Sequence, residues 1–225
     1  MRITPLGLLL VAALIQPLCA QQLGNEVSRV EITLTQAISE GDFAKAREMV
    51  RSGTALNELD MNGGSPLNEA IRSGNTEFAR ELLSAGADPN LADGGGDTPL
   101  MMAAWENNVE IEEELLHRGA KVNSANLQGE TALLLSTHTF SDGKTVELLL
   151  NAGADPNARS TSGFTSLISA AMVSDWHTSE ELIKAGADPT AKDKYGRSAK
   201  TFACERGRRG NAQVCALVRE AANKR

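Results

Sequence analysis

The chain has 225 residues, of which 41% are hydrophobic, 23% charged and 4% aromatic, a composition typical of a soluble globular protein. With so few aromatic residues, its core must be built from Leu, Ala, Val and Ile, which favours small, closely packed helices over a large β-sandwich. Residues 21–190 carry 11 basic and 26 acidic side chains, and this acidic body argues against a nucleic-acid groove, where phosphate neutralisation dominates affinity.

The first twenty residues have the pattern of a signal peptide. Arg2 gives a positive start, an apolar run follows over Leu6–Ile15, and Ala20 offers a small residue for cleavage. We therefore expect an exported protein whose mature chain begins at Gln21. Residues 21–30 would form a short lead segment before the folded domain.

Two alternatives for this leader stay open. An uncleaved anchor is disfavoured, because a run of ten apolar residues is shorter than the ~20 that a membrane-spanning helix needs. Lipidation of Cys19 is disfavoured by the bulky Leu18 before it, where a lipobox requires a small residue. No other stretch is apolar enough to suggest a transmembrane segment.

Three landmarks recur along the rest of the chain at a nearly constant step. One is a glycine after an apolar segment, which in two copies belongs to the phrase AGADPN. Another is a short motif that begins with Ser or Thr, and the third is a glycine two residues before that motif. They stand at Gly53, Gly86, Gly119, Gly153 and Gly186; at Ser65, Thr98, Thr131, Thr165 and Ser198; and at Gly63, Gly96, Gly129, Gly163 and Gly196. The first set is spaced by 33, 33, 34 and 33 residues, which predicts an array of structural repeats.

One repeat is predicted to contain two helices and a finger. Thr98 caps the first helix and Pro99 fits its first position. Asn107–Asn108 ends that helix, and residues 109–118 carry their apolar side chains on one face, as a second amphipathic helix does. Gly119 closes the second helix, because glycine adopts the left-handed conformation without a Cβ clash. The turn-rich residues that follow form an extended finger.

These motifs resemble the ankyrin repeat, whose step is 33 residues and whose core motif reads Thr-Pro-Leu-His-x-Ala. The resemblance covers nearly all of residues 31–223 and implies an all-α solenoid of about six helix-turn-helix units with β-hairpin-like fingers. Degraded motifs in the first and last units are expected of terminal repeats, which face water on one side. One extra residue in the fourth unit predicts a slightly longer turn around Asp142–Gly143. The predicted units are 31–59, 60–92, 93–125, 126–159, 160–190 and 191–223.

Residues that could support catalysis or bind a metal are scattered. His117, His138 and His177 come from different units and show no metal-ligand spacing. The run Glu112–Glu114 is predicted to be a solvated helix face, since a helix points its three side chains in different directions. No Gly-rich phosphate loop or nucleophile elbow occurs in the sequence. We therefore expect no enzyme activity, no cofactor and no metal.

The mature chain has two cysteines, Cys204 and Cys215, and both lie in the last unit. The repeat register places them on the two helices of that unit, where their side chains can approach disulfide distance. Export would put them in an oxidising compartment. We predict a disulfide that staples the C-terminal cap, with two buried thiols as the alternative.

A partner of an ankyrin-like stack is expected on the concave side, which the finger tips and the exposed ends of the first helices form. Aromatic and methionine side chains gathered there mark an interface. The alternative, that some of them fold back and pack between the fingers, stays open. Trp176 is expected instead in an inter-helix turn on the convex side. The predicted partner-binding residues are Trp105, Glu106, Leu127, His138, Phe164, Met172, Val173 and Tyr195.

The resemblance implies a protein–protein interaction module, which we expect to be monomeric and periplasmic or secreted. Small exported bacterial ankyrin proteins resemble two roles: support of a periplasmic defence enzyme, notably catalase, and immunity or accessory partner of a secreted effector such as a phospholipase. A different class is a membrane-surface tether. Residues 191–225 carry 10 basic and 3 acidic side chains, and such a tether would depend on Arg206, Arg208 and Arg209. A solvated terminal helix pair also accounts for this charge.

Overall fold

The computed structural model describes residues 32–138, 143–204 and 211–224. The predicted signal peptide and Cys19 lie outside the described residues, as do Arg206, Arg208 and Arg209. Residues 34–225 form one compact unit, distinct from residues 1–33, and the fold below is that of this unit.

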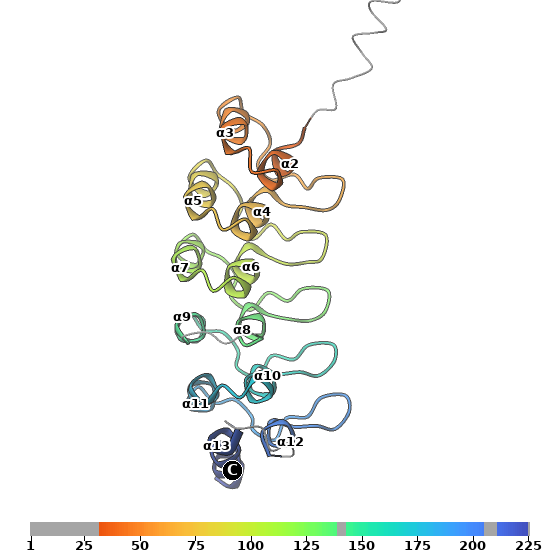
Figure 1. Cartoon of the computed structure of the whole chain (residues 1–225), viewed down its shortest axis with the longest axis vertical. Coiled ribbons are helices and arrows are strands. Elements are labelled where there is room, and N and C mark those ends of the chain that lie inside the picture. The colour runs from red at the N-terminus through yellow and green to blue at the C-terminus, as the bar shows by residue number, and fades with distance from the viewer. Residues whose placement is uncertain (1–31, 139–142, 205–210, 225) are drawn as a thin grey trace, which may run out of the picture. The chain divides into compact units, whose positions relative to one another are not determined.

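Helix pairs build the compact unit, each made of a first and a second helix joined by a turn. Figure 1 shows the first helices in one column, the second helices in a column beside it, and the fingers extending from the side of the first helices. The described residues thus contain six pairs and confirm the predicted all-α repeat fold. The helices are α2 (Leu34–Ser39), α3 (Phe43–Arg51), α4 (Pro66–Arg72), α5 (Thr76–Ser84), α6 (Pro99–Trp105), α7 (Val109–His117), α8 (Ala132–Ser136), α9 (Lys144–Asn151), α10 (Ser166–Val173), α11 (Trp176–Lys184), α12 (Ala199–Cys204) and α13 (Asn211–Asn223).

Side-chain caps fix where the helices begin. The side chains of Ser65, Thr98, Thr131 and Thr165 each accept the backbone N–H three residues on, at 3.3–3.5 Å, and so start α4, α6, α8 and α10 as predicted. Asp42, Asn75, Asn108 and Asp175 cap the second helices α3, α5, α7 and α11 in the same way. Gly143 precedes α9 and provides no side-chain cap. The caps therefore recur at the repeat period and set the positions of both columns.

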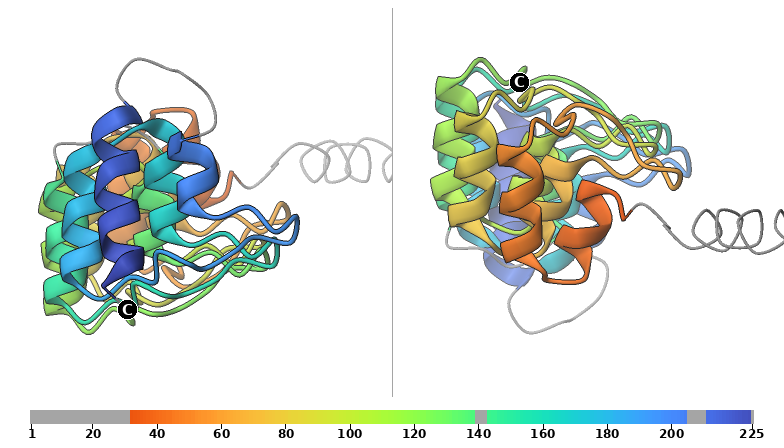
Figure 2. Two further views of the ribbon diagram at one scale, coloured as in Figure 1. Left: turned by 90° about the horizontal axis from the view of Figure 1, so that it is seen from below. Right: turned by 90° about the horizontal axis from the view of Figure 1, so that it is seen from above.

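The fingers are closed turns, and within the described ranges they contain no regular strand, only an isolated bridge between Lys192 and Ser198. Neighbouring fingers are joined by backbone hydrogen bonds, such as Leu127 N–H to the Gly95 carbonyl at 3.2 Å. Gly96 allows this approach: its φ is +82°, and a Cβ there would lie 3.0 Å from the Leu127 nitrogen. Figure 2 shows the fingers stacked on one another when the unit is viewed along the column.

A ladder of asparagines links each repeat to the next. Asn123 Nδ2 donates to the Gly153 carbonyl at 3.0 Å, and its Oδ1 accepts the N–H of Asp155 at 2.8 Å. The same pair of bonds recurs at Asn57, Asn90 and Asn157. The asparagine that ends the repeated phrase AGADPN therefore satisfies backbone groups of the following unit, at the end of its second helix.

The fourth unit departs from the others more than its one extra residue suggests. Helix α8 has 5 residues, against 7 in α6, and α9 begins only at Lys144. The segment between α8 and α9 therefore covers residues 137–143, compared with 106–108 in the preceding unit. Residues 139–142 of that turn lie outside the described part.

Leu, Ala, Ile and Val fill most of the core, as the composition requires; Ala103, Leu115 and Leu133 are each 0% exposed. An acidic side chain of α7 is buried with them. Glu112 on α7 is also 0% exposed, so its prediction as part of a solvated face is wrong. It lies on the side of α7 that packs against α9, and Thr145 Oγ1 donates to its Oε1 at 2.9 Å. Its other carboxylate oxygen has no partner, and burial raises the pKa of Glu112 to about 7.

Candidate protein-binding surface

A groove of about 380 Å³ lies between two neighbouring fingers and the first helices. Its lining comes from the end of α4, from α6 and α8, and from the fingers that precede α6 and α8. We call it the Trp105 groove and define it by Arg72, Asp97, Met102, Trp105, Glu106 and Glu130.

Trp105 is positioned by the helix that it ends. Thr98 caps α6 and Pro99 occupies its first position, so the 7-residue helix closes with Trp105 at the groove. Glu106 is the C-cap, and Asn107 then turns the chain with a φ of 53°, in the left-handed region. The Trp105 side chain keeps 45% of its surface exposed. Its ring meets the ring of His138 edge to face, with the centroids 5.7 Å apart.

The structure brings some of the predicted binding residues together and separates others. Trp105 and Glu106 line the groove, and His138 contacts the Trp105 ring. Leu127 lies on a finger, 71% exposed, and does not line the groove. Met172, 44% exposed, and the half-buried Val173 end α10 and do not line it either.

Phe164 and Tyr195 belong to a different cluster, around Arg197 in the last finger. The Arg197 guanidinium lies 4.9 Å from the centroid of the Tyr195 ring and 4.7 Å from that of Phe202. Phe202 in turn contacts the half-buried Phe164, with centroids 6.1 Å apart. Arg197 also pairs with Asp193 at 2.8 Å. Phe164 therefore packs against the last unit, and Tyr195 is the exposed edge of a cationic–aromatic cluster.

Sequence reasoning missed Asp97 and Glu130, two of the three acidic residues that line the groove. Both stand immediately before a capping threonine, Thr98 or Thr131, and so occupy the same position of successive repeats. The equivalent residue in the fifth unit is Phe164, which was predicted to bind. The repeat register therefore aligned Asp97 and Glu130 with a predicted binding position, but the prediction gave more weight to aromatic side chains than to these charged ones.

Two family models match the chain, one described as ankyrin repeats (3 copies) over residues 34–126 and one as ankyrin repeat over residues 128–161. The chain belongs to the ankyrin repeat family. A search of the curated proteins found no match. Ankyrin repeats are protein–protein interaction modules and are generally not enzymes, so the family match indicates that this domain binds a protein. The Trp105 groove lies wholly within residues 34–161.

In the described part of this ankyrin domain, no group of three or more His, Cys, Asp or Glu side chains could hold a metal ion. None of the helices in the described ranges combines the length and the apolar character that crossing a membrane requires.

Trp176 does not line the groove and belongs to a second helix, whereas Trp105 ends a first helix. It is the first residue of α11, one position after the capping Asp175. The prediction that it lies in the inter-helix turn is therefore wrong. Its ring stacks on that of His177, with centroids 6.0 Å apart, and the side chain is 40% exposed. Trp176 is therefore a matched reference for Trp105 in side chain and exposure.

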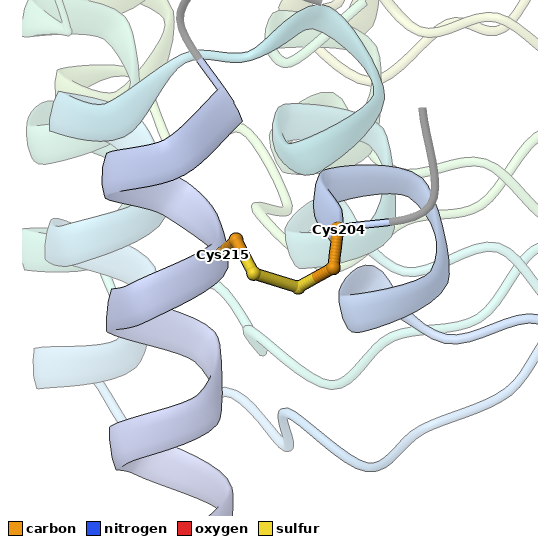
Figure 3. Close-up of a disulfide and its surroundings, with 2 residues drawn as sticks. All are labelled: Cys204 and Cys215. Carbon is orange, nitrogen blue, oxygen red and sulfur yellow. A yellow bond between two sulfur atoms is a disulfide. The ribbon is translucent and has the colours of Figure 1, made fainter. Parts of the chain in front are cut away.

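The terminal ankyrin repeat is closed by a disulfide. Cys204 ends α12, Cys215 lies in α13, and their Cα atoms are 5.1 Å apart (Figure 3). The bond joins the two helices of the last described repeat. It lies in the part of the domain that the two family models do not cover.

Proposed function

We propose that this protein is an exported bacterial ankyrin repeat domain that resides in the periplasm and binds a partner protein in the Trp105 groove. The observation that carries the binding site is the half-exposed Trp105 at a groove that several repeats build together. Exposed tryptophans in such positions are frequent hot spots of protein interfaces. The export and the compartment rest on the leader pattern of residues 1–20.

The bonds between repeats support binding by a surface that exists before the partner arrives. Finger-to-finger hydrogen bonds and the asparagine ladder hold the groove residues in neighbouring units at fixed spacing. A preformed surface avoids the ordering cost of association. As the partner we propose a periplasmic defence enzyme such as catalase, which corresponds to the first of the two roles that small exported ankyrin proteins suggest.

The Trp105→Ala variant is expected to lose the partner. The full chain, expressed with its own leader, is recovered from the periplasmic fraction and used to capture proteins from periplasmic extract, which mass spectrometry then identifies. Loss of a Trp hot spot costs roughly 2 kcal/mol or more, or about 30-fold in affinity. Trp176→Ala is the matched control and should recover the same partner as the wild type.

Two results would contradict the proposal. Equal recovery of the same partners by wild type and folded Trp105→Ala would place the binding site elsewhere on the domain. Accumulation of the unprocessed chain in the cytosol would contradict export. Circular dichroism of each variant shows that a loss of capture does not come from unfolding.

A further inference from the structure

The charges around the Trp105 groove are unbalanced. Asp97, Glu106 and Glu130 line it, and none of the three forms an ion pair with a Lys or Arg of the described residues. Among the described residues that line the groove, Arg72 is the single cation. The groove therefore presents three carboxylates and one guanidinium.

Glu69 already engages that guanidinium. The Nε and Nη2 atoms of Arg72 donate to the Glu69 carboxylate at 2.6–3.0 Å. The pKa of Arg72 is raised first by this hydrogen bond, and to a smaller extent by the charge of Glu106. Since Glu69 adds a fourth carboxylate, Arg72 does not neutralise the acids that line the groove.

Uncharged amides hold two of these acids in place. Asn126 Nδ2 donates to Asp97 Oδ1 at 2.7 Å and approaches Glu130 Oε2 at 3.5 Å. Asn68 Nδ2 donates to the backbone carbonyl of Asp97 at 2.7 Å. These amide donors hold the ends of the fingers next to α6 and α8, and they add no positive charge to the groove.

The rest of the groove is apolar. Trp105 is 45% exposed and Met102 is half-buried, while Met101 and Leu135 beneath them are 1% and 7% exposed. The volume of about 380 Å³ is at the low end of the ~300–1,000 Å³ that ligand sites occupy, which suits an inserted side chain.

We propose that the Trp105 groove receives an arginine side chain from an extended segment of the partner protein. Its apolar stem would lie against Trp105 and Met102, and its guanidinium would meet the carboxylates of Asp97 and Glu130. The stem of an arginine covers apolar surface, and its guanidinium pairs with carboxylates through a planar fork of donors. This inference rests on the proposed function and names the chemistry of the partner's contact surface.

Two of the chain's own described basic residues near the C-terminus, Arg197 and Lys194, are already engaged. Arg197 lies between the Tyr195 and Phe202 rings and pairs with Asp193, and Lys194 lies 5.1 Å from the centroid of the Tyr195 ring. Because the acids of the groove form no ion pair with a described Lys or Arg, we take the occupant to be a cation from another protein, and a second copy of this chain is an outcome of the test.

The test uses a fluorescein-labelled peptide, Leu-Arg-Leu-Arg-Leu, and the same peptide with citrulline at both arginine positions. Citrulline keeps the shape of the side chain and removes its charge. Anisotropy is measured with the mature chain at about 0.15 M salt, where distant surface charges are screened. Glu106→Gln/Glu130→Gln removes two charges from the groove. Glu113→Gln/Glu147→Gln removes two exposed charges from the second helices and serves as the control.

The arginine peptide is expected to bind the wild type at least about tenfold more tightly than the citrulline peptide. The groove variant and Trp105→Ala should each weaken that binding about tenfold, and the control variant less than about twofold. Equal binding of the two peptides, or equal losses from the groove and control variants, would overturn the proposal. So would a dimer of the wild type in sedimentation that the groove variant abolishes, because the occupant would then be a second copy.

Failure of this inference can be told apart from failure of the proposed function. If capture of the natural partner depends on Trp105 but is unchanged in Glu106→Gln/Glu130→Gln, the groove binds a protein, and the proposal that it receives an arginine is wrong. If capture is insensitive to Trp105 itself, the proposed function fails, whatever the peptides do.

Discussion

Glu112→Gln is expected to stabilise the protein above pH 7, by up to roughly 3 kcal/mol in the free energy of unfolding. Burial raises the pKa of Glu112 from 4.5 to about 7, so the folded protein holds this proton more tightly than the unfolded chain. The resulting stabilisation is complete below pH 4.5, declines as the pH rises toward 7, and is lost above it. At neutral and basic pH the fold therefore carries a buried charge with one hydrogen bond, to Thr145.

Urea unfolding of wild type and Glu112→Gln at pH 5 and pH 8 measures this effect. We expect wild type and variant to be similarly stable at pH 5, and the variant to be more stable at pH 8. The gain in unfolding free energy is at most about 3 kcal/mol, because the new amide N–H groups replace an oxygen that has no partner. Glu147→Gln, at an exposed position on α9, should keep the pH dependence of the wild type. Identical pH profiles for wild type and Glu112→Gln would show that this carboxyl is not buried.

Replacing both cysteines, as Cys204→Ala/Cys215→Ala, is expected to lower the free energy of unfolding by about 3 kcal/mol. The disulfide closes a short loop, with a sequence separation of 11, and loops of about this size gain that much by restricting the unfolded chain. The loss should fall on the last described unit, whose two helices the bond joins. The Trp105 groove belongs to other repeats, so partner binding by the folded variant should be unchanged.

Urea unfolding with and without reductant measures the contribution of this bond. Reductant should bring the wild type to the stability of the double variant and should leave the double variant unaffected. The opposing result is a wild type that reductant does not change, together with two alkylated cysteines when the unreduced, denatured protein is analysed by mass spectrometry.

Much of the fold could be predicted from the sequence, because the signals that specify it are local and repeat. A capping threonine such as Thr98, a proline after it and a closing glycine each act within a few residues of their own position. The asparagine of AGADPN escaped notice because its partners lie in the next repeat, about 30 residues on; Asn90 bonds to Gly119 and Lys121. Such a function becomes visible only once the stacking of the units is known.

Charge was the property that sequence reasoning judged least well. Glu112 lies next to Ile111 and three residues before Leu115, so it falls near the apolar face of α7, yet its charge suggested solvent. Its burial depends on the close packing of α7 against α9, which the sequence of one helix does not contain. Asp97 and Glu130 were not predicted to bind a partner, because acidic residues before a helix cap suggest side chains that only face solvent.

The predicted binding surface proved to be two regions of unlike chemistry. Trp105 and Glu106 share an acidic groove, whereas Phe164 and Tyr195 pack around Arg197 in the last repeats. Register alone aligned these residues, since it gives the position of a side chain within its repeat. It does not give the charge of the neighbours that each repeat contributes.

Site-specific photo-crosslinking tests most directly whether the Trp105 groove binds the partner. Benzoylphenylalanine, an aromatic side chain that forms a covalent bond with a neighbour on irradiation, replaces Trp105 or, as the control, Trp176 in cells that produce the full chain with its leader. A covalent adduct with one partner protein is expected from position 105 and not from position 176. An adduct from position 176 with none from position 105 would contradict the assignment and place the interface on the second helices.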